Sequence, residues 1–261
     1  MDDSSETVFD ARLETFRHWQ TTPWGRLRYT IAAANLAAWL PAGPLTVLDV
    51  GGGNGLDAID LAAHGHHVTI ADISEPALAA ARALADQETV ADRISTRLVD
   101  VDDLVRDFGP RSFDVVLCHN LLQYVPDARD LLRTLATLVS GAGVVSVIAP
   151  NADADPLLTA VRTSDLDEAI RQLDSSLRHT VTYDTDTRAC YADDVAQGLT
   201  DAGLRVLAHR GIRSVCDLIV DDERKTDPHF FARLEQLELA MSSRAPYIYT
   251  ARFFHLIATP N

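Results

Sequence analysis

Residues 47–55 read Val-Leu-Asp-Val-Gly-Gly-Gly-Asn-Gly, an apolar run that leads directly into a glycine-rich turn. Glycine adopts positive φ freely and, because it has no side chain, lets a ligand approach the backbone closely. Residues 56–64 then show the apolar spacing that is typical of a helix. The stretch therefore predicts a strand, a tight turn and a helix, and it marks the first candidate ligand site.

The same alternation continues along the chain. Five apolar runs of strand length occur at residues 45–50, 67–71, 94–99, 113–118 and 143–148. Helical patterns separate them at residues 56–64, 75–86 and 127–139. Alternating strands and helices are typical of a parallel sheet with helices on both faces. The near-continuous apolar character of the runs fits strands that are buried on both sides.

The C-terminal part repeats the alternation after an interruption. Residues 191–202 predict a helix that ends at Gly203, and a strand (204–212), a helix (228–241) and a final strand (248–259) follow. We therefore expect a doubly wound, mostly parallel seven-stranded α/β sheet with a Rossmann-like fold. Its core is residues 45–151 and 191–261. Residues 1–44, with two helices within 8–40 that begin near Val8, form an N-terminal lid, and residues 152–190 form a cap insertion after strand five.

Composition narrows the class of protein. The net charge of −15 disfavours nucleic acid and anionic membranes as partners, because binding to nucleic acid draws on Lys and Arg side chains. The acidic N-terminus lacks the features of a signal peptide, and the apolar stretch 30–40 is too short to span a membrane. The three cysteines show no metal-binding spacing. We expect a cytoplasmic protein without a metal site.

The glycine turn is compatible with two kinds of cofactor. A dinucleotide site favours the spacing GxGxxG, with the pyrophosphate at the helix N-terminus. Here Gly51, Gly53 and Gly55 give GxGxG, Ala58 stands where the last glycine would be, and Asp49 would repel a pyrophosphate. The dehydrogenase interpretation is therefore the weaker one.

Acidic residues at three successive strand ends favour S-adenosylmethionine instead. Asp49 suits a ligand that carries an ammonium and a sulfonium group. Asp72, seventeen residues after Gly55, can accept hydrogen bonds from both ribose hydroxyls. After the third strand, Asp102 can accept from an adenine amino group while Val101 offers its backbone amide. Together these positions predict three parts of one binding site.

With these residues the chain resembles class I S-adenosylmethionine-dependent methyltransferases, and more specifically the bacterial tRNA 5-carboxymethoxyuridine methyltransferases. The matching stretches are 25–28, 48–74, 117–130, 211–213 and 246–248, with Arg252 and His255. The resemblance implies that Arg28 pairs with the cofactor carboxylate and that His119 faces the methionine and sulfonium region as the catalytic residue. The other cofactor-binding residues that it implies are Asp49, Gly51, Gly52, Gly53, Asp72, Ile73, Val101 and Asp102.

The substrate side is less defined. The candidate substrate-binding residues are Tyr124, which follows the fourth predicted strand, Tyr247, which follows Pro246, and Arg213 and Arg252. Arg213 and Arg252 fall in the last two predicted strands, where a buried arginine needs a carboxylate partner, either from the substrate or from a structural Asp or Glu. We interpret the acidic run 221–223 as a solvated loop.

The cap departs from the tRNA enzymes. Those enzymes carry a lysine-rich run there, whereas residues 165–188 contain no lysine and six Asp or Glu. We therefore expect O-methylation of a small molecule, with a carboxylate as the acceptor. A carboxylate is ionised near neutral pH, so His119 need not act as a general base. The alternatives are the tRNA reaction itself and a cofactor-binding regulatory protein without catalysis.

Overall fold

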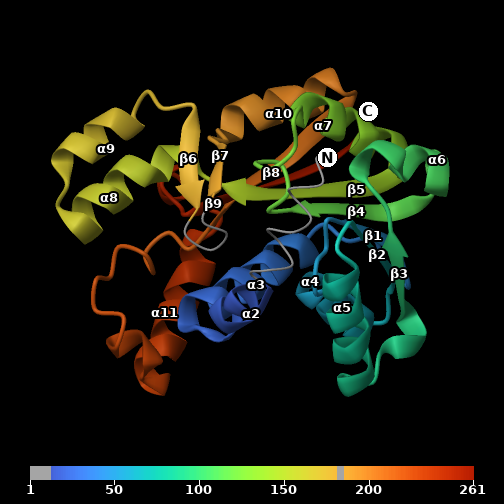
Figure 1. Ribbon diagram of the computed structural model, residues 1–261, viewed down its shortest axis with the longest axis horizontal. Coiled ribbons are helices and arrows are strands. Elements are labelled where there is room, and N and C mark those ends of the chain that lie inside the picture. Colours follow the sequence, from blue (N-terminus) through green and yellow to red (C-terminus); the bar gives the residue numbers. More distant parts are fainter. Residues whose placement is uncertain (1–12, 181–184) are drawn as a thin grey trace.

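A seven-stranded sheet forms the centre of the computed structural model, which describes residues 13–180 and 185–261 (Figure 1). The strand order is β3-β2-β1-β4-β5-β9-β8. Strands β1 to β5 are parallel, and β9 runs antiparallel to its neighbours β5 and β8. The strand bounds are β1 Thr46–Val50, β2 His67–Asp72, β3 Ile94–Leu98, β4 Phe113–His119, β5 Val139–Pro150, β8 Leu204–Ile212 and β9 Phe253–Pro260. The doubly wound, mostly parallel sheet predicted from the sequence is confirmed.

Helices cover both faces of the sheet (Figure 1). Side chains alternate along each strand, so that Leu48 of β1 faces one helical layer while Val47 faces the other. One layer consists of α6 Leu104–Phe108, α7 Ala128–Leu138 and α10 Ala192–Asp201. The opposite layer consists of α3 Pro23–Ala37, α4 Leu56–Ala63, α5 Glu75–Gln87 and α11 Pro228–Met241. The central strands are therefore buried on both sides, as the apolar runs indicate, whereas the edge strand β3 is half-exposed.

In the part of the chain that the structure describes, two helices precede the sheet. They are α2 Leu13–Thr21 and α3, separated by Thr22. Thr22 ends the first helix and begins the second, because its hydroxyl accepts a hydrogen bond from the backbone NH of Gly25 (3.1 Å) and Pro23 occupies the first helical position. Val8, near which the first predicted helix begins, lies outside the described residues.

The segment after β5 forms a separate unit beside the end of that strand (Figure 1). It contains α8 Asp155–Thr163 and α9 Leu166–Gln172, followed by β6 Leu177–Thr180 and β7 Thr185–Arg188. The last two strands pair with each other in a small antiparallel sheet of their own. The polar stretch around residues 174–188 thus contains two strands that its Thr- and Asp-rich composition does not predict.

Some element boundaries differ from the prediction. Strand β5 begins at Val139 rather than at residue 143, because Val139 pairs with Phe113 before the register shifts. Strand β9 begins at Phe253 rather than at Ile248. Residues 247–249 instead form a short 3-10 helix, η5 Tyr247–Tyr249, held by local bonds such as Tyr249 N to Pro246 O (3.1 Å). The remaining 3-10 turns are η1 Ala91–Arg93, η2 Val101–Asp103, η3 Ala152–Ala154 and η4 Arg224–Thr226.

The described residues contain no helix that is long and apolar enough to cross a membrane. Strands β1, β2, β4 and β5 end at the same edge of the sheet, since they are parallel neighbours or share a neighbour. The loops that follow them therefore converge, and α2, α3, the cap and the loop after β8 contribute residues above the same edge. This edge contains the candidate site.

Candidate active site

A cavity of about 600 Å³ lies at the carboxyl edge of the sheet. Residues from α2 and α3, from the loops after β1, β2, β4 and β8, and from the cap line its wall. The predicted site residues among them are Arg28, Asp49, Gly51, Gly52, Gly53, Asp72, Ile73, Val101, His119, Tyr124, Arg213 and Arg252. Residues that are distant in sequence are thus brought to one cavity.

The glycine turn between β1 and α4 forms the floor of one half of the cavity. Gly51, Gly53 and Gly55 all have positive φ, which explains why glycine stands at these positions. Gly52 is required for a different reason, since a Cβ atom there would lie 2.5 Å from Oδ2 of Asp49. The turn therefore keeps its backbone open to the cavity and close to a buried carboxylate.

Asp72 ties the glycine turn to the second strand. Its Oδ2 accepts a hydrogen bond from the backbone NH of Gly53 (2.8 Å), and its Oδ1 accepts from the NH of Ser74 (2.9 Å). The hydroxyl of Ser74 in turn caps α5 by accepting from Ala77 N (3.1 Å). Asp72 therefore stabilises the glycine turn and also lines the cavity.

Two predicted residues do not reach the cavity wall. Asp102 lies in η2 with an exposed side chain, and its backbone NH donates to Asp100 (3.1 Å). Only its neighbour Val101 lines the cavity. Tyr247 is also absent from the wall: its side chain is 42% exposed, because η5 replaces the predicted strand and directs it outward.

Arg28 makes a contact that the sequence does not reveal. The guanidinium is buried, and its Nη1 donates to both carboxylate oxygens of Asp57 at 2.7 and 2.5 Å. Burial opposes ionisation of Asp57, but the charge of Arg28 and the hydrogen bonds from Arg28 and His119 outweigh it and hold the pKa of Asp57 well below its usual range. The Nε atom of Arg28 is buried and has no hydrogen-bond partner in the described part of the chain.

His119, the last residue of β4, continues this contact into the sheet. Its Nδ1 lies 3.1 Å from Oδ2 of Asp57, and its Nε2 lies 2.8 Å from Oγ of Ser146. Ser146 Oγ is also 2.8 Å from Nε2 of His255. We call Arg28, Asp57, His119, Ser146 and His255 the buried polar network.

The direction of these hydrogen bonds follows from the ionised carboxylate. Asp57 only accepts, so Nδ1 of His119 carries the proton and donates to it. Burial lowers the pKa of His119 despite the nearby carboxylate, so the ring is neutral at pH 7 and its Nε2 accepts from the Ser146 hydroxyl. The Ser146 oxygen then accepts from Nε2 of His255. Both ring nitrogens of His119 are therefore engaged by the protein.

Asp49 lies beside this network without joining it. Its carboxylate is buried, and no hydrogen bond to it is found within residues 13–180 and 185–261. Burial, and secondarily the charge of Asp57, raise the pKa of Asp49 well above its ordinary value. A buried carboxylate without a hydrogen-bond donor is costly unless a cationic ligand approaches it.

The other half of the cavity is rich in cations. Arg213 follows β8 and forms a bidentate pair with Asp217, with Nε to Oδ2 at 2.8 Å. Its guanidinium also lies over the ring of Phe253, at 5.4 Å. The sequence allows either a substrate carboxylate or a structural Asp or Glu as the partner of Arg213. The structure contains a structural partner, Asp217.

Arg252 precedes β9 and shares a carboxylate with a cap residue. Its Nη1 donates to Oδ1 of Asp155 at 2.7 Å, and Nη2 of Arg178 donates to the same oxygen at 2.6 Å. Burial and the charge of Arg178 lower the pKa of Arg252 to about 10. Two cations therefore meet at one carboxylate at the N-terminus of α8.

A second shared carboxylate, that of Asp222, belongs to the acidic loop before η4. Nη2 of Arg162 donates to Oδ2 of Asp222 (2.7 Å), and Nζ of Lys225 donates to its Oδ1 (2.6 Å). Arg162 Nη1 also donates to the backbone oxygens of Asp217 (3.3 Å) and Ile219 (3.2 Å). The interpretation of residues 221–223 as a solvated loop is thus incomplete, because Asp222 holds two cations of the cavity wall.

Sequence reasoning did not find four residues that shape this cavity: Asp57, Arg162, Arg178 and Lys225. Asp57 has the pattern of an acidic residue in the first turn of a helix, which is common at any N-terminus. Lys225 carried a visible signal, because it is the only lysine among 23 Lys and Arg residues.

Comparisons with known proteins agree with this fold. Residues 47–143 match a family model described as a methyltransferase domain. The tRNA 5-carboxymethoxyuridine methyltransferase of Escherichia coli (strain K12) is 29% identical over 96% of this chain and 95% of its own length. A ubiquinone biosynthesis O-methyltransferase of Chromobacterium violaceum is 36% identical over 44% of this chain and 48% of its own. A solved S-adenosylmethionine-dependent methyltransferase from Mesorhizobium loti has a TM-score of 0.61 at 22% identity, covering 87% of this chain and 97% of that one.

Proposed function

We propose that this chain, which belongs to the class I S-adenosylmethionine-dependent methyltransferases, methylates a carboxylate oxygen of a small anionic molecule. The observation that carries the proposal is that two guanidinium nitrogens of Arg252, Nε and Nη2, have no hydrogen-bond partner among the described residues. The side chain of Arg252 is 30% exposed in the cavity wall. The unused Nε and Nη2 suit a carboxylate, which binds a guanidinium through two parallel hydrogen bonds.

The opposite half of the cavity fits the cofactor. Asp49 and Asp72 offer carboxylates for an ammonium group and for ribose hydroxyls, and both line the wall. The buried Nε of Arg28 leaves one donor unsatisfied within the described residues, which supports pairing with a ligand carboxylate. When bound, S-adenosylmethionine supplies an electrophilic methyl group, and transfer forms a carbon–oxygen bond as the carbon–sulfur bond breaks to give S-adenosylhomocysteine.

The protein's contribution is to bind and orient the acceptor. A carboxylic acid with an ordinary pKa of about 4 is already ionised at pH 7, so no residue has to remove a proton. His119 is not needed as a general base, and it is not available as one, because its Nδ1 is bonded to Asp57 and its Nε2 to Ser146. We propose that His119 and Asp57 act as positioning residues that hold Arg28, and that catalysis comes mainly from proximity and orientation.

The charge change of the reaction supports this assignment. An acceptor carboxylate pairs with Arg252, whereas a methyl ester is neutral and loses that ion pair. The product is therefore held less tightly than the substrate. Tyr124 and Arg213 also line the acceptor half of the cavity, but Asp217 already neutralises Arg213, so Arg252 is the principal anchor.

A second candidate is tRNA methylation. It is favoured by the near full-length similarity to the Escherichia coli enzyme. The charge of the cap argues against it, because residues 165–188 contain no lysine and six acidic residues. A polyanion would need basic residues along the surface that it covers.

The experiment uses a cofactor with a radiolabelled methyl group. The protein is incubated separately with a library of carboxylic acids and with total tRNA, and methyl esters are recognised because alkaline hydrolysis releases labelled methanol. We expect label in small carboxylic acids. Arg252→Met should lower kcat/KM about 10- to 100-fold, the loss of a charge-assisted hydrogen bond. The variant leaves Asp155 paired with Arg178, so no buried carboxylate is stranded.

Arg133→Met is the matched control, since Arg133 lies on the exposed side of α7 and its side chain pairs only with Asp130 among the residues that the structure describes. It should leave kcat/KM unchanged. Label in tRNA and in no small acid would replace the proposal by the tRNA reaction. Cofactor binding without turnover on either class would contradict both reactions.

A further inference from the structure

The only lysine of the chain lies in the wall of the cavity. The other 22 cationic side chains among the 23 Lys and Arg residues are arginines. The side chain of Lys225 is 2% exposed, and its ammonium lies 5.7 Å from the centre of the Trp24 ring. An ammonium group has three donors, and Nζ has one hydrogen-bond acceptor in the described part of the chain, Oδ1 of Asp222.

Asp222 does not belong to Lys225 alone. Arg162 donates to both of its oxygens, from Nη2 to Oδ2 at 2.7 Å and from Nη1 to Oδ1 at 3.3 Å. One negative charge is thus shared by two cations. A buried charge without a full partner is unfavourable, so this corner of the cavity is prepared for another anion.

The same arrangement occurs a second time in the cavity. Asp155 is shared by Arg178 and Arg252, whereas Asp217 and Arg213 neutralise each other. Within the described residues, five cations at this side of the cavity therefore share three carboxylates in ion pairs, an excess of two positive charges over these pairs; the buried carboxylate of Glu238 accepts from backbone NH groups of residues 214–216 and is not counted among them. This excess is found in a chain whose net charge is −15. The excess is local. One positive charge of it belongs to Arg162 and Lys225, which share Asp222, and the other belongs to Arg178 and Arg252, which share Asp155.

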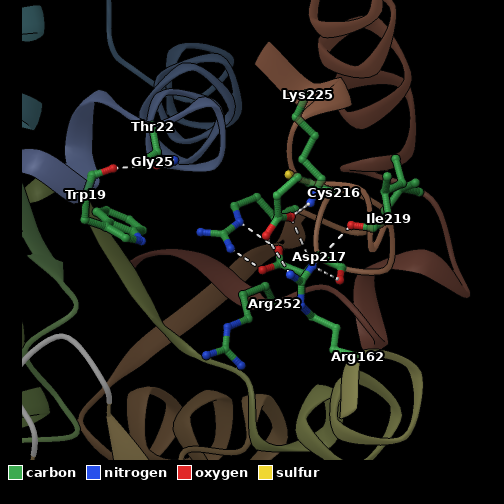
Figure 2. A network of polar contacts seen from close by, with 12 residues as sticks. Trp19, Thr22, Gly25, Arg162, Cys216, Asp217, Ile219, Lys225 and Arg252 are labelled. Atoms are coloured by element: carbon green, nitrogen blue, oxygen red, sulfur yellow. Dashed lines mark hydrogen bonds and ion pairs between the residues drawn. The ribbon is translucent and has the colours of Figure 1, made fainter. Parts of the chain in front are cut away.

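The two places are separate but close. Asp217 and its partner Arg213 connect them: Nη1 of Arg162 donates to the backbone oxygen of Asp217 (3.3 Å), and the backbone NH of Arg252 donates to the backbone oxygen of Arg213 (3.0 Å). Figure 2 shows the side chains of Lys225, Arg162 and Arg252 arranged around Asp217. A small molecule that spans the Arg213–Asp217 pair can therefore place one acidic group at each end.

We propose that the acceptor is a dianion, whose second anionic group, a carboxylate or a phosphate, binds Lys225 and Arg162 while the group to be methylated binds Arg252. This inference rests on the proposed function. Binding of both groups removes the excess positive charge at both places. The product keeps the second anionic group, so that a dicarboxylate gives a singly charged monoester.

The single lysine makes the proposal directly measurable. Protein grown with carbon-13 and nitrogen-15 lysine has one labelled side chain, so one Cε–Nζ signal reports on Lys225. The probes are α,ω-dicarboxylates and ω-phosphonocarboxylates of graded length, each compared with the monoamide that lacks the second charge. We expect a dianion of suitable length to shift the signal saturably, and its monoamide to shift it little. Comparison of the two series tells whether the second group is carboxylate or phosphate.

Kinetics provide the second readout. We expect kcat/KM for the dianion to exceed that for its monoamide about 10- to 100-fold, in line with one charge-assisted contact. In Lys225→Met this ratio should fall towards one, and Lys225→Arg should restore it. The methionine variant leaves Asp222 paired with Arg162, and cofactor binding by calorimetry checks that it has folded.

The possible failures are distinguishable. Equal kcat/KM for dianions and monoamides, with no shift of the lysine signal, would overturn this inference and leave carboxylate methylation intact. If no carboxylic acid accepts the methyl group, the proposed function itself fails. In that case a saturable lysine shift with dianions alone would still support Lys225 and Arg162 as an anion-binding site, and its absence would refute the site as well.

Discussion

Replacement of Asp57 by asparagine removes the central charge of the buried polar network. The substitution keeps the size of the side chain but leaves the guanidinium of Arg28 without its anion. Arg28 is buried, and Asp57 supplies both of the oxygens that Nη1 contacts, at 2.7 and 2.5 Å. The neutral amide oxygen can still accept from Arg28 or from His119, but it cannot offset a positive charge.

The expected loss of stability follows from this geometry. At an effective dielectric constant of 20, two opposite unit charges about 4 Å apart attract each other by about 4 kcal/mol. Removal of one partner of a buried pair costs about 3–5 kcal/mol. The Asp57 side chain is 17% exposed towards the cavity, so water relieves part of the cost and we expect about 3 kcal/mol. This is a large part of the roughly 5–15 kcal/mol that stabilises a folded domain.

Urea unfolding followed by tryptophan fluorescence measures the effect. With an m-value of roughly 3 kcal/mol per molar for a chain of this size, the midpoint should fall by about 1 M. The control is Asp60→Asn in the same helix, whose side chain is 49% exposed and whose ion pair is with His64 at 3.8 Å. It should change stability by less than about 0.5 kcal/mol. Equal midpoints for the two variants would refute the role given to the Arg28–Asp57 pair.

Two further predictions concern buried titratable groups near this network. Asp49→Asn should raise the free energy of unfolding of the cofactor-free protein by about 0.5–2 kcal/mol, because it removes a buried carboxylate whose pKa is raised, and should weaken S-adenosylhomocysteine binding in calorimetry. A less stable variant would contradict this. Burial lowers the pKa of His119 and His255 below the ordinary 6.5, so below that pH the unfolded chain binds more protons than the folded one. The free energy of unfolding should therefore fall as the pH drops from 7 to 5, and His255→Gln should flatten this slope; an unchanged slope would argue against the buried neutral ring.

The fold was largely predictable because its signal is repeated along the chain. The central parallel strands β1, β4 and β5 are mostly buried and appear as apolar runs, whereas the edge strand β3 is half-exposed and still follows the alternation of strands and helices, so five runs define the sheet before any contact is known. The first and last residues of a strand were less predictable where hydrogen bonding to a neighbouring strand decides them. Val139 has the pattern of the end of a helix but pairs with Phe113, and the chain from Tyr247 to Tyr249 is apolar enough for a strand but forms a 3-10 turn.

The residues that we propose to bind the cofactor could be grouped from the sequence, since they lie at strand ends and in one glycine turn. The residues proposed to bind the acceptor could not, because their partners come from segments that only the fold brings together. Asp155 and Arg178 belong to the cap, whereas Arg252 precedes the last strand. No spacing in the sequence relates Arg252 to Asp155, which lies 97 positions earlier. Asp102 shows the opposite error: its position after the third strand suits adenine binding, but its side chain is exposed to solvent.

The charge distribution connects the acidic composition with the cationic cavity. Charges on the surface are screened beyond roughly 8–10 Å at physiological salt, so the net charge of −15 acts weakly on a molecule that is enclosed by the cavity wall. The shared carboxylates Asp155 and Asp222 hold their cations a few ångströms from such a molecule. A polyanion would instead lie along the acidic exterior and meet its repulsion over many residues. The same sequence thus favours a small anion inside the cavity and disfavours a large one outside it.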